Sequence, residues 1–313
     1  MRYGAALARA LEKNDHEIVF TTRKHPDTLP VAEFSKQQYV AVGRYNPKTS
    51  LTRVKSGALR QLKLCELFKD NPPIVAISHG SPDLCRVAFG LKIPIITTVD
   101  TPYAEEVHRL TIPYSKYIVA SEAIPRKTLQ KYNIDGKLVS FKGVDEIAWI
   151  KDAQPKIKYD FGKPLIVVRE IEAKATYSKE KLDLLPLAKQ LTKLGKVVYL
   201  ARYQRRRIEG IIVPQYIDSV SLVSQADLFV GVGGTITREA ALQGTPSIII
   251  KVFSDQYVND FLIKKGFPIF KTKTKNAFKL AKKIVGRRCD VERLLWDLEN
   301  PVGTISDVIR QMP

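Results

Sequence analysis

Residues 231–239 combine groups that together could bind a phosphate. Gly231, Gly233 and Gly234 directly follow an apolar run that ends at Val230, and a helical stretch begins at Thr235. A turn between a strand and a helix presents free backbone N–H groups and a positive helix end to an anion. Gly233 and Gly234 have no side chain to keep a phosphate at a distance. The pattern therefore predicts an anion site at this turn.

Three side chains after the glycines extend this prediction to a nucleotide. Thr235 and Thr237 can cap the helix and donate to phosphate oxygens. Glu239 lies about one turn further on, where a carboxylate could accept hydrogen bonds from ribose hydroxyls. The alternative is a tight turn into a packed helix, which the glycines alone would favour. The combination favours a nucleotide diphosphate.

A second group of polar residues lies in the first half of the chain. His79, Gly80 and Ser81 follow the apolar run 74–78, and Asp100 ends the next apolar run. Ser81 suits a helix N-cap and Pro82 the first helical turn. Ligands of doubly wound domains bind at the carboxyl ends of the strands, so we expect these residues on one rim.

The segment after Asp100 adds two candidates for acid–base chemistry. Asp100 and Glu106 could act as general base and general acid on a sugar. Arg109 could bind a phosphate or orient Glu106. The alternatives are helix caps and surface charges, above all for Glu105, and a His79 satisfied by a neighbouring backbone group.

Short apolar runs alternate with helical stretches along the whole chain, which predicts parallel sheets covered by helices on both faces. The expected strands are 18–22, 74–78, 93–97, 117–120, 165–168, 197–200, 227–230 and 247–250. The expected helices are 51–69, 82–90, 125–132, 181–194, 220–225 and 235–243, with more helices from Asn276 onward. A polar stretch at 150–163 suggests a linker, so we expect one domain over 1–152 and another over 153–313.

The first predicted element is a helix, Met1 to Asn14, followed by a strand. Doubly wound domains begin with a strand whose end carries a ligand-contacting turn. We therefore expect the first strand of this domain to be missing, and the natural protein to start upstream.

Composition sets further bounds. The net charge of +19 favours polyanions, anionic membrane surfaces or phosphorylated small molecules, although a general preference for lysine would produce it as well. Arg202, Arg205, Arg206 and Arg207 form the densest basic cluster. Three widely spaced cysteines form no zinc or disulfide pattern, and no apolar run reaches the roughly 18 residues of a membrane span. Cytoplasmic residence is the resulting expectation.

Three motifs in this order carry a family resemblance: HGSPDLCRVAFGLKIPIITTVDT, RLTIPYSKYIVASEAIP and GGTITREAALQGTPS. Together they resemble the domain-of-unknown-function 354 family of archaea and bacteria, over nearly the whole chain. That family looks like a branch of the GT-B superfamily. The resemblance implies two Rossmann-like domains with a cleft between them.

Two enzyme groups share parts of the pattern. The block from Gly233 to Glu239, with the following DQYVNDFL, is similar to the enzyme that adds N-acetylglucosamine to peptidoglycan lipid precursors. That similarity implies diphosphate at the glycine turn, ribose at Glu239, and a donor-sugar contact at Asp255 and Gln256.

The first half is also similar to UDP-N-acetylglucosamine 2-epimerases. The resemblance implies that Asp100 matches one catalytic acid of those enzymes, and that the segment of Glu106 and Arg109 matches the segment that bears a second catalytic acid. Ser81 stands where the epimerases have an acid, and Arg169–Glu170 replaces their histidine.

The sequence thus predicts a GT-B protein that binds a UDP-type sugar and acts as a glycosyltransferase, with Asp100 as the base and Arg169 or Arg238 stabilising the departing diphosphate. No Asp-x-Asp metal signature is present, so no obligatory metal or other cofactor is expected. A lipid-phosphate or polysaccharide acceptor, with peripheral contact at the inner membrane face, would suit the charge. The rival hypotheses are a nucleotide-sugar epimerase and a non-catalytic nucleotide- or polyanion-binding protein; nucleic-acid binding is disfavoured because no RNA-binding motif is present.

Overall fold

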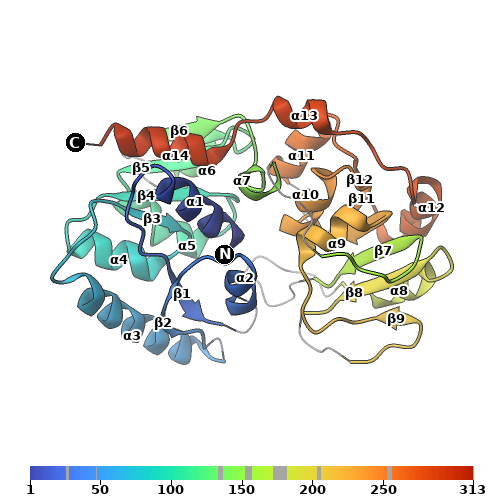
Figure 1. The fold of residues 1–313 in the computed structure, drawn as a ribbon, viewed down its shortest axis with the longest axis horizontal. Helices are drawn as coiled ribbons and strands as arrows, with labels where there is room; N and C mark the ends of the chain where they lie inside the picture. Colours follow the sequence, from blue (N-terminus) through green and yellow to red (C-terminus); the bar gives the residue numbers. More distant parts are fainter. Residues whose placement is uncertain are drawn as a thin grey trace. The chain divides into compact units, whose positions relative to one another are not determined.

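The computed structural model describes residues 1–25, 28–46, 48–132, 137–151, 157–171, 182–202, 206–251 and 256–312. The chain forms two compact units (Figure 1). Unit 1 comprises Met1–Ala148 and Glu299–Pro313, and unit 2 comprises Trp149–Leu298. Each is an α/β unit built on parallel strands, as the apolar runs predict.

Unit 2 is built on one parallel sheet with the strand order β12-β11-β10-β7-β8-β9. The strands are β7 (Leu165–Arg169), β8 (Lys196–Leu200), β9 (Ile211–Ile212), β10 (Leu228–Gly231), β11 (Ser247–Ile250) and β12 (Ile269–Thr272). β10 pairs with β7 on one side and β11 on the other, so its carboxyl end lies inside the sheet. The reversal of strand order beside β7 is where ligands bind in open α/β sheets.

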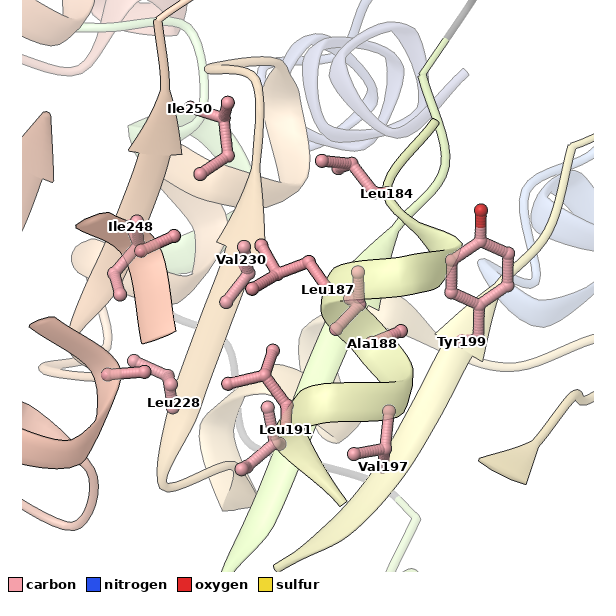
Figure 2. Close-up of a cluster of buried hydrophobic side chains, with 14 of the residues drawn as sticks. Leu184, Leu187, Ala188, Leu191, Val197, Tyr199, Leu228, Val230, Ile248 and Ile250 are labelled. Carbon is pink, nitrogen blue, oxygen red and sulfur yellow. The ribbon is translucent and has the colours of Figure 1, made fainter. Parts of the chain in front are cut away.

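Helices cover both faces of this sheet. They are α8 (Leu185–Leu191), α9 (Ser219–Gln225), α10 (Thr235–Ala241), α11 (Tyr257–Lys264), α12 (Thr274–Ile284) and α13 (Glu292–Trp296). Figure 2 shows the core on one face, where Leu187 and Leu191 of α8 meet Val197, Leu228 and Ile248 of the strands. Phe229 points to the opposite face and packs with side chains of α9. Burial on both faces explains the nearly continuous Ile and Val runs.

Unit 1 contains two separate parallel pieces of sheet (Figure 1). One piece pairs β1 (Thr21–Lys24) with β2 (Val40–Arg44). The other has the order β3-β4-β5-β6, formed by β3 (Ala76–His79), β4 (Ile95–Val99), β5 (Tyr117–Ser121) and β6 (Lys137–Phe141). The helices are α1 (Arg2–Glu12), α2 (Leu29–Phe34), α3 (Ser50–Phe68), α4 (Pro82–Gly90), α5 (Glu105–Arg109), α6 (Arg126–Gln130), α7 (Ile147–Ile150) and α14 (Pro301–Arg310). The boundary between the two units falls within α7. A short 3-10 helix spans Ile112–Tyr114.

A cavity separates the two pieces of sheet. It encloses about 780 Å³ and is lined by residues of α1, by the chain from Asp15 to Arg23, and by the chain from Pro73 to Ser81. Within the described residues, no strand lies between β1 and β3.

Helix ends follow the local sequence in several places. Thr49 and Thr52 form a reciprocal capping box at the start of α3, and Asp218 accepts from the Ser221 backbone N–H at the start of α9. Ser81 is the N-cap of α4 and Pro82 its first residue, as predicted, although the Ser81 side chain makes no capping hydrogen bond. The predicted cap Thr235 is instead the first helical residue of α10, and Gly234 is the N-cap.

The expected elements differ from the observed ones mainly in their bounds. The strand expected at 18–22 is displaced to Thr21–Lys24, whereas the strand 247–250 and the helix 82–90 are found at the expected residues. The division at 152 assigned the whole C-terminal part to the second domain, whereas Glu299–Pro313 belongs to unit 1. There α14 packs against α1, β5 and β6, because its apolar face completes the core of unit 1. Within the described part of the chain, no helix is long and apolar enough to cross a bilayer.

The core of unit 2 gives a direct stability test. Leu191→Ala should lower the free energy of unfolding by about 2–5 kcal/mol, because it leaves a cavity among fully buried neighbours. Leu62→Ala in α3 is the control, since Leu62 is 64% exposed. Urea denaturation followed by circular dichroism measures both variants. Equal losses for the two would contradict the assigned packing of α8.

Candidate functional site

The predicted glycine turn lies at the carboxyl end of β10, where it joins α10. Gly233 has φ of +96°, in the left-handed region that favours glycine, whereas Gly234 has φ of −79°. Gly234 and Thr235 are exposed, and their backbone follows the end of an inner strand. The turn therefore presents a short stretch of accessible backbone at the carboxyl edge of the sheet, as the sequence predicts.

Three side chains brace the back of this turn. Asn259 Nδ2 donates to the Gly233 carbonyl oxygen at 2.8 Å, and Gln256 Nε2 donates to the Val232 carbonyl oxygen at 2.9 Å. Asn259 Nδ2 also donates to Gln256 Oε1 at 3.0 Å, which locks the two amides together. Arg238 NH1 donates to the Gly233 carbonyl oxygen at 3.2 Å. Because the carbonyl oxygens are held from behind, the conformation of the turn is fixed.

The two glycines of the turn play different parts. A Cβ on Gly233 would lie 2.5 Å from Gln256 Oε1 and 2.6 Å from Asn259 Nδ2, so both side chains would have to move and the bracing would be disturbed. A Cβ on Gly234 would meet no heavy atom within 4 Å. Gly233 is therefore required by the bracing, whereas Gly234 leaves open space in front of the turn.

The residues that follow the glycines point inward. Thr237, Arg238 and Glu239 are 1%, 7% and 1% exposed. Glu239 Oε1 accepts from Trp149 Nε1 at 2.9 Å, and Oε2 accepts from Ser219 Oγ at 2.7 Å. Glu239 thus joins α10 to α7 and α9 inside unit 2. The predicted contact of Glu239 with ribose remains a prediction.

Other predicted contacts of unit 2 lie around the same edge. Arg169, the last residue of β7, donates from NH1 to the Leu200 carbonyl oxygen at 3.3 Å. Glu170 Oε2 accepts from the Arg202 backbone N–H, which ties the ends of β7 and β8 together. Asp255, predicted as a donor-sugar contact, and Arg205 lie outside the described residues. Gln256 is part of the brace, a role that the motif comparison did not predict.

Because the two glycines have different roles, replacing each by alanine should change the stability of unit 2 by a different amount. Gly233→Ala should destabilise unit 2 by about 1–3 kcal/mol, because alanine is strained at positive φ. The clash of the added Cβ with Gln256 and Asn259 adds to this loss. Gly234→Ala should cost less than about 1 kcal/mol, since its backbone angles are ordinary and its surroundings open. Thermal unfolding of the two variants measures the difference, and the reverse order would refute the described turn.

In unit 1, His79 ends β3 and takes part in two interactions. Its Nδ1 lies 2.7 Å from Thr98 Oγ1, and its ring packs edge-on against Tyr3 at 5.2 Å between centroids. The His79 side chain is exposed at the end of β3. Desolvation by the surrounding groups lowers its pKa, and the nearby carboxylate of Asp100 opposes this change. His79 therefore lies at the carboxyl ends of the strands, as expected, and its partner is the Thr98 hydroxyl rather than a backbone group.

Gly80 and Ser81 continue the chain into α4. Gly80 has φ of +63°, a turn that favours glycine. The Ser81 N–H donates to Ser78 Oγ at 3.0 Å, and Arg60 NH1 donates to Ser81 Oγ at 3.4 Å. Asp83, in the first turn of α4, accepts from Arg23 NH2 at 2.9 Å. Arg60 keeps a buried Nε without a hydrogen-bond partner, and desolvation and then Arg23 lower its pKa to about 10.

Asp100 lies at the end of β4, close to several titratable side chains. Burial is the largest influence on three neighbouring groups, raising the pKa of Tyr3 and lowering those of His79 and His108. The charge of Asp100 is a smaller influence in the upward direction on each of them, which places all three in its field. His108 Nε2 lies 2.6 Å from the Thr101 carbonyl oxygen, to which it donates when that nitrogen carries hydrogen. Asp100 is thus at the predicted rim, beside His79.

Two carboxylates near Tyr3 were not predicted. Asp145 and Glu146 are 8% and 1% exposed and, after burial, their charges contribute to raising the pKa of Tyr3. They follow β6, a strand absent from the expected set. The sequence signal was available, since Gly-Val-Asp-Glu directly follows the apolar residues of that strand. A recognised strand there would have placed both carboxylates on the rim.

Of the two roles considered for Arg109, orienting Glu106 is not found in the structure, and binding a phosphate remains a prediction. Arg109 Nε and NH2 donate to Glu105 Oε1 at 3.0 and 2.8 Å, one turn back on α5. Lys131 Nζ lies 3.6 Å from the other oxygen of Glu105. The i,i+4 spacing brings Glu105 and Arg109 to the same helix face, whereas Glu106 lies on another and is exposed.

The lowered histidine pKa values make stability depend on pH. Because the folded state holds the pKa of His79 and of His108 below 6.5, the unfolded chain binds more protons just below that pH. The free energy of unfolding should therefore fall as the pH drops through about 6.5 and below. His108→Gln should flatten this dependence, because His108 is 5% exposed and burial lowers its pKa. His79→Gln, at an exposed position, should change it less. Urea titrations over roughly pH 5 to 8 measure the slopes, and equal slopes for both variants would count against the description.

The fold of both units defines a class. Each unit has a Rossmann-like fold on parallel strands, as in the GT-B fold class, and solved structures similar to this chain include glycosyltransferases and UDP-GlcNAc 2-epimerases. MnaA of S. aureus in a co-structure with UDP matches with a TM-score of 0.69 and 18% identity, over 99% of this chain and 92% of that one. UDP-GlcNAc 2-epimerase from Neisseria meningitidis, bound to UDP-GlcNAc, matches with a TM-score of 0.64 and 16% identity, over 99% and 96%. The glycotransferase of kitacinnamycin matches with a TM-score of 0.61 and 13% identity, over 99% of this chain and 95% of that one.

The chain belongs to the family described as protein of unknown function (DUF354), whose model matches residues 1–312. An uncharacterized protein of Methanocaldococcus jannaschii, MJ0665, is 27% identical over 322 residues, covering 96% of this chain and 92% of that protein. The family resemblance carried by the three sequence motifs is thereby confirmed.

Within the described residues, no group of three or more histidine, cysteine, aspartate or glutamate side chains could hold a metal ion.

Proposed function

We propose that this protein binds a nucleotide-diphosphate sugar of the UDP type and transfers the sugar to an acceptor. The observation that carries the proposal is the braced glycine turn at the end of β10, with open space in front of Gly234. The likeness of the whole fold to a UDP co-structure and to an epimerase bound to UDP-GlcNAc supports it. A diphosphate is the ligand whose charge suits accessible backbone N–H groups at such a turn.

In this proposal, unit 2 holds the nucleotide. The backbone of Gly233, Gly234 and Thr235 contacts the diphosphate, and the Thr235 hydroxyl, which is exposed, can add a hydrogen bond. Arg238 is bonded to the Gly233 carbonyl oxygen, so it acts by positioning the turn and by its charge. Arg169 at the end of β7 is a second source of positive charge. Positive charge at this edge would stabilise the negative charge that develops on the departing diphosphate.

Unit 1 supplies the acid–base groups. Asp100 is the proposed base that removes the proton of the acceptor hydroxyl while the bond from the sugar to the diphosphate breaks. His79, Gly80 and Ser81 lie at the end of the neighbouring strand β3, from which they can contact the sugar or the acceptor. Glu106 and Arg109 are exposed on α5 and remain proposed contacts. The scheme needs only these side chains and the backbone of unit 2.

A second candidate is an epimerase-like enzyme that rearranges the donor without any acceptor. The cluster of Asp100, His79 and the buried Asp145 and Glu146 favours it, because proton removal and return need acid and base groups on one rim. A non-catalytic nucleotide-binding protein with the same fold is the third candidate. For the transferase, a lipid-phosphate or polysaccharide acceptor and a peripheral membrane contact suit the net charge of +19.

Calorimetry with UDP tests the nucleotide site. Gly234→Val should abolish UDP binding, because its side chain occupies the open space in front of the turn, while the protein stays folded. Ala58→Val on the exposed face of α3 is a control of the same bulk. Unchanged UDP affinity in Gly234→Val would refute the placement of the diphosphate.

Turnover of UDP-GlcNAc then separates the candidates. A transferase releases UDP only when an acceptor is present, whereas an epimerase changes the sugar when none is added. Asp100→Asn should retain UDP binding and lose at least about 100-fold of either activity, the usual contribution of a general base. Full activity of Asp100→Asn would remove Asp100 from the scheme while leaving the nucleotide site in place.

A further inference from the structure

The long helix α3 exposes a row of apolar side chains. Leu51, Val54 and Leu62 are 62%, 69% and 64% exposed, and Ala58 between them is exposed as well. The spacing of three, four and four residues places these four side chains on one side of the helix, along about 16 Å of its axis. We refer to Leu51, Val54, Ala58 and Leu62 as the apolar stripe.

The inward face of the same part of α3 is polar, which reverses the usual pattern of a surface helix. Arg60 NH1 donates to Ser81 Oγ, and Gln61 Nε2 donates to Asp83 Oδ1, both at 3.4 Å. A Cβ on Gly57 would lie 3.1 Å from Asp83 Oδ1, so α3 and α4 are in close contact here. α3 therefore cannot turn the apolar stripe inward without breaking these contacts.

The neighbouring elements leave the apolar stripe uncovered. α3 packs against α4 and β2, and Figure 1 shows it at the margin of unit 1. Single exposed apolar side chains are common on soluble proteins, whereas a continuous apolar row is typical of an interaction surface. The apolar stripe thus leaves water only when something binds to it.

Basic side chains flank the apolar stripe. Arg53, Lys55 and Lys63 are exposed on α3. The one acidic residue of this helix is Glu66, whose carboxylate lies 3.0 Å from Lys69 Nζ. An apolar row with basic flanks is the pattern of a helix that lies in the interface of an anionic bilayer. There, the lysine stems pack along apolar groups while the ammonium groups reach the lipid phosphates.

Other occupants fit this surface less well. In a two-fold pairing of this chain the same patch meets itself, so Arg53, Lys55 and Lys63 of one copy would face those of the other. The net charge of +19 adds to this repulsion. A nucleic acid would match the basic side chains but leave the apolar stripe in water. An anionic lipid surface matches both.

We propose that the apolar stripe and its basic flanks dock unit 1 onto an anionic lipid surface, with α3 lying in the plane of the headgroups. This inference rests on the membrane contact included in the proposed function, and it locates that contact on α3. The apolar side chains enter the boundary between headgroups and acyl chains, and the basic side chains contact lipid phosphates.

Sedimentation of the full chain with vesicles tests this inference. The vesicles contain equimolar phosphatidylglycerol and phosphatidylcholine, and vesicles of phosphatidylcholine alone are the neutral comparison. The apolar variant carries Val54→Ser and Leu62→Ser. Its control carries Leu110→Ser and Trp296→Ser, because these side chains are 51% and 72% exposed and lie outside α3.

A charge variant tests the basic flanks. It carries Lys55→Glu and Lys63→Glu, which reverse two charges of α3. Its control carries Lys282→Glu and Lys283→Glu, at exposed positions of α12 in unit 2, and changes the net charge by the same amount. This pair of variants separates docking by α3 from a general attraction of a basic protein to an anionic surface.

The parent chain should bind the anionic vesicles and not the neutral ones. The apolar variant and the charge variant should each lower the partition coefficient by about tenfold or more, whereas each control should lower it by less than about threefold. Equal losses in a variant and its control would overturn the proposal, as would a parent chain that does not bind the anionic vesicles.

Two further measurements separate the alternatives. A dimer in analytical ultracentrifugation that the apolar variant converts to a monomer would overturn the proposal, because a second copy would then cover the apolar stripe. Calorimetry with UDP should give both variants the affinity of the parent chain. A loss of vesicle binding is thereby distinguished from a failure of the proposed nucleotide site.

Discussion

The carbonyl oxygens of Val232 and Gly233 are held from behind by the side chains of Gln256, Asn259 and Arg238, and the candidate site of unit 2 depends on this bracing. A backbone turn can present N–H groups outward only if its carbonyl groups have partners elsewhere. Here the partners come from the start of α11 and from α10 itself. The parallel sheet supplies the remaining constraint, because β10 is held between β7 and β11.

Much of this arrangement could be predicted from the sequence because it is local. The glycines, the apolar run before them and the helix after them are neighbours in the chain, and their conformations follow from their residue types. The bracing could not be predicted, since Gln256 and Asn259 lie more than 20 residues beyond the turn. The same applies to Glu239, whose partner Trp149 is 90 residues away. A carboxylate in the first turns of a helix carries no local sign of whether it faces a ligand or the core.

The missed strands have a common physical basis. β2 and β12 are partly exposed, and their sequences VAVGR and IFKT mix apolar with charged residues, so they lack the continuous apolar pattern of buried strands. β6 was missed as well, and with it the buried pair Asp145 and Glu146. The expected strand 18–22 is displaced because Ile18 and Val19 line the cavity instead of pairing with β2. Apolar character alone thus did not fix which residues enter the ladder, and Val19 is 44% exposed.

The hydrogen bond between Trp149 and Glu239 gives the molecule an optical property. The chain has two tryptophans, Trp149 and Trp296, and both belong to unit 2. Trp296 is 72% exposed, whereas the indole N–H of Trp149 is bonded to a buried carboxylate on α10, two turns or less from Gly234. Tryptophan emission therefore reports on unit 2 alone, and one of its two sources is a ring hydrogen-bonded to the helix that follows the glycine turn. Unit 1 contains tyrosines but no tryptophan.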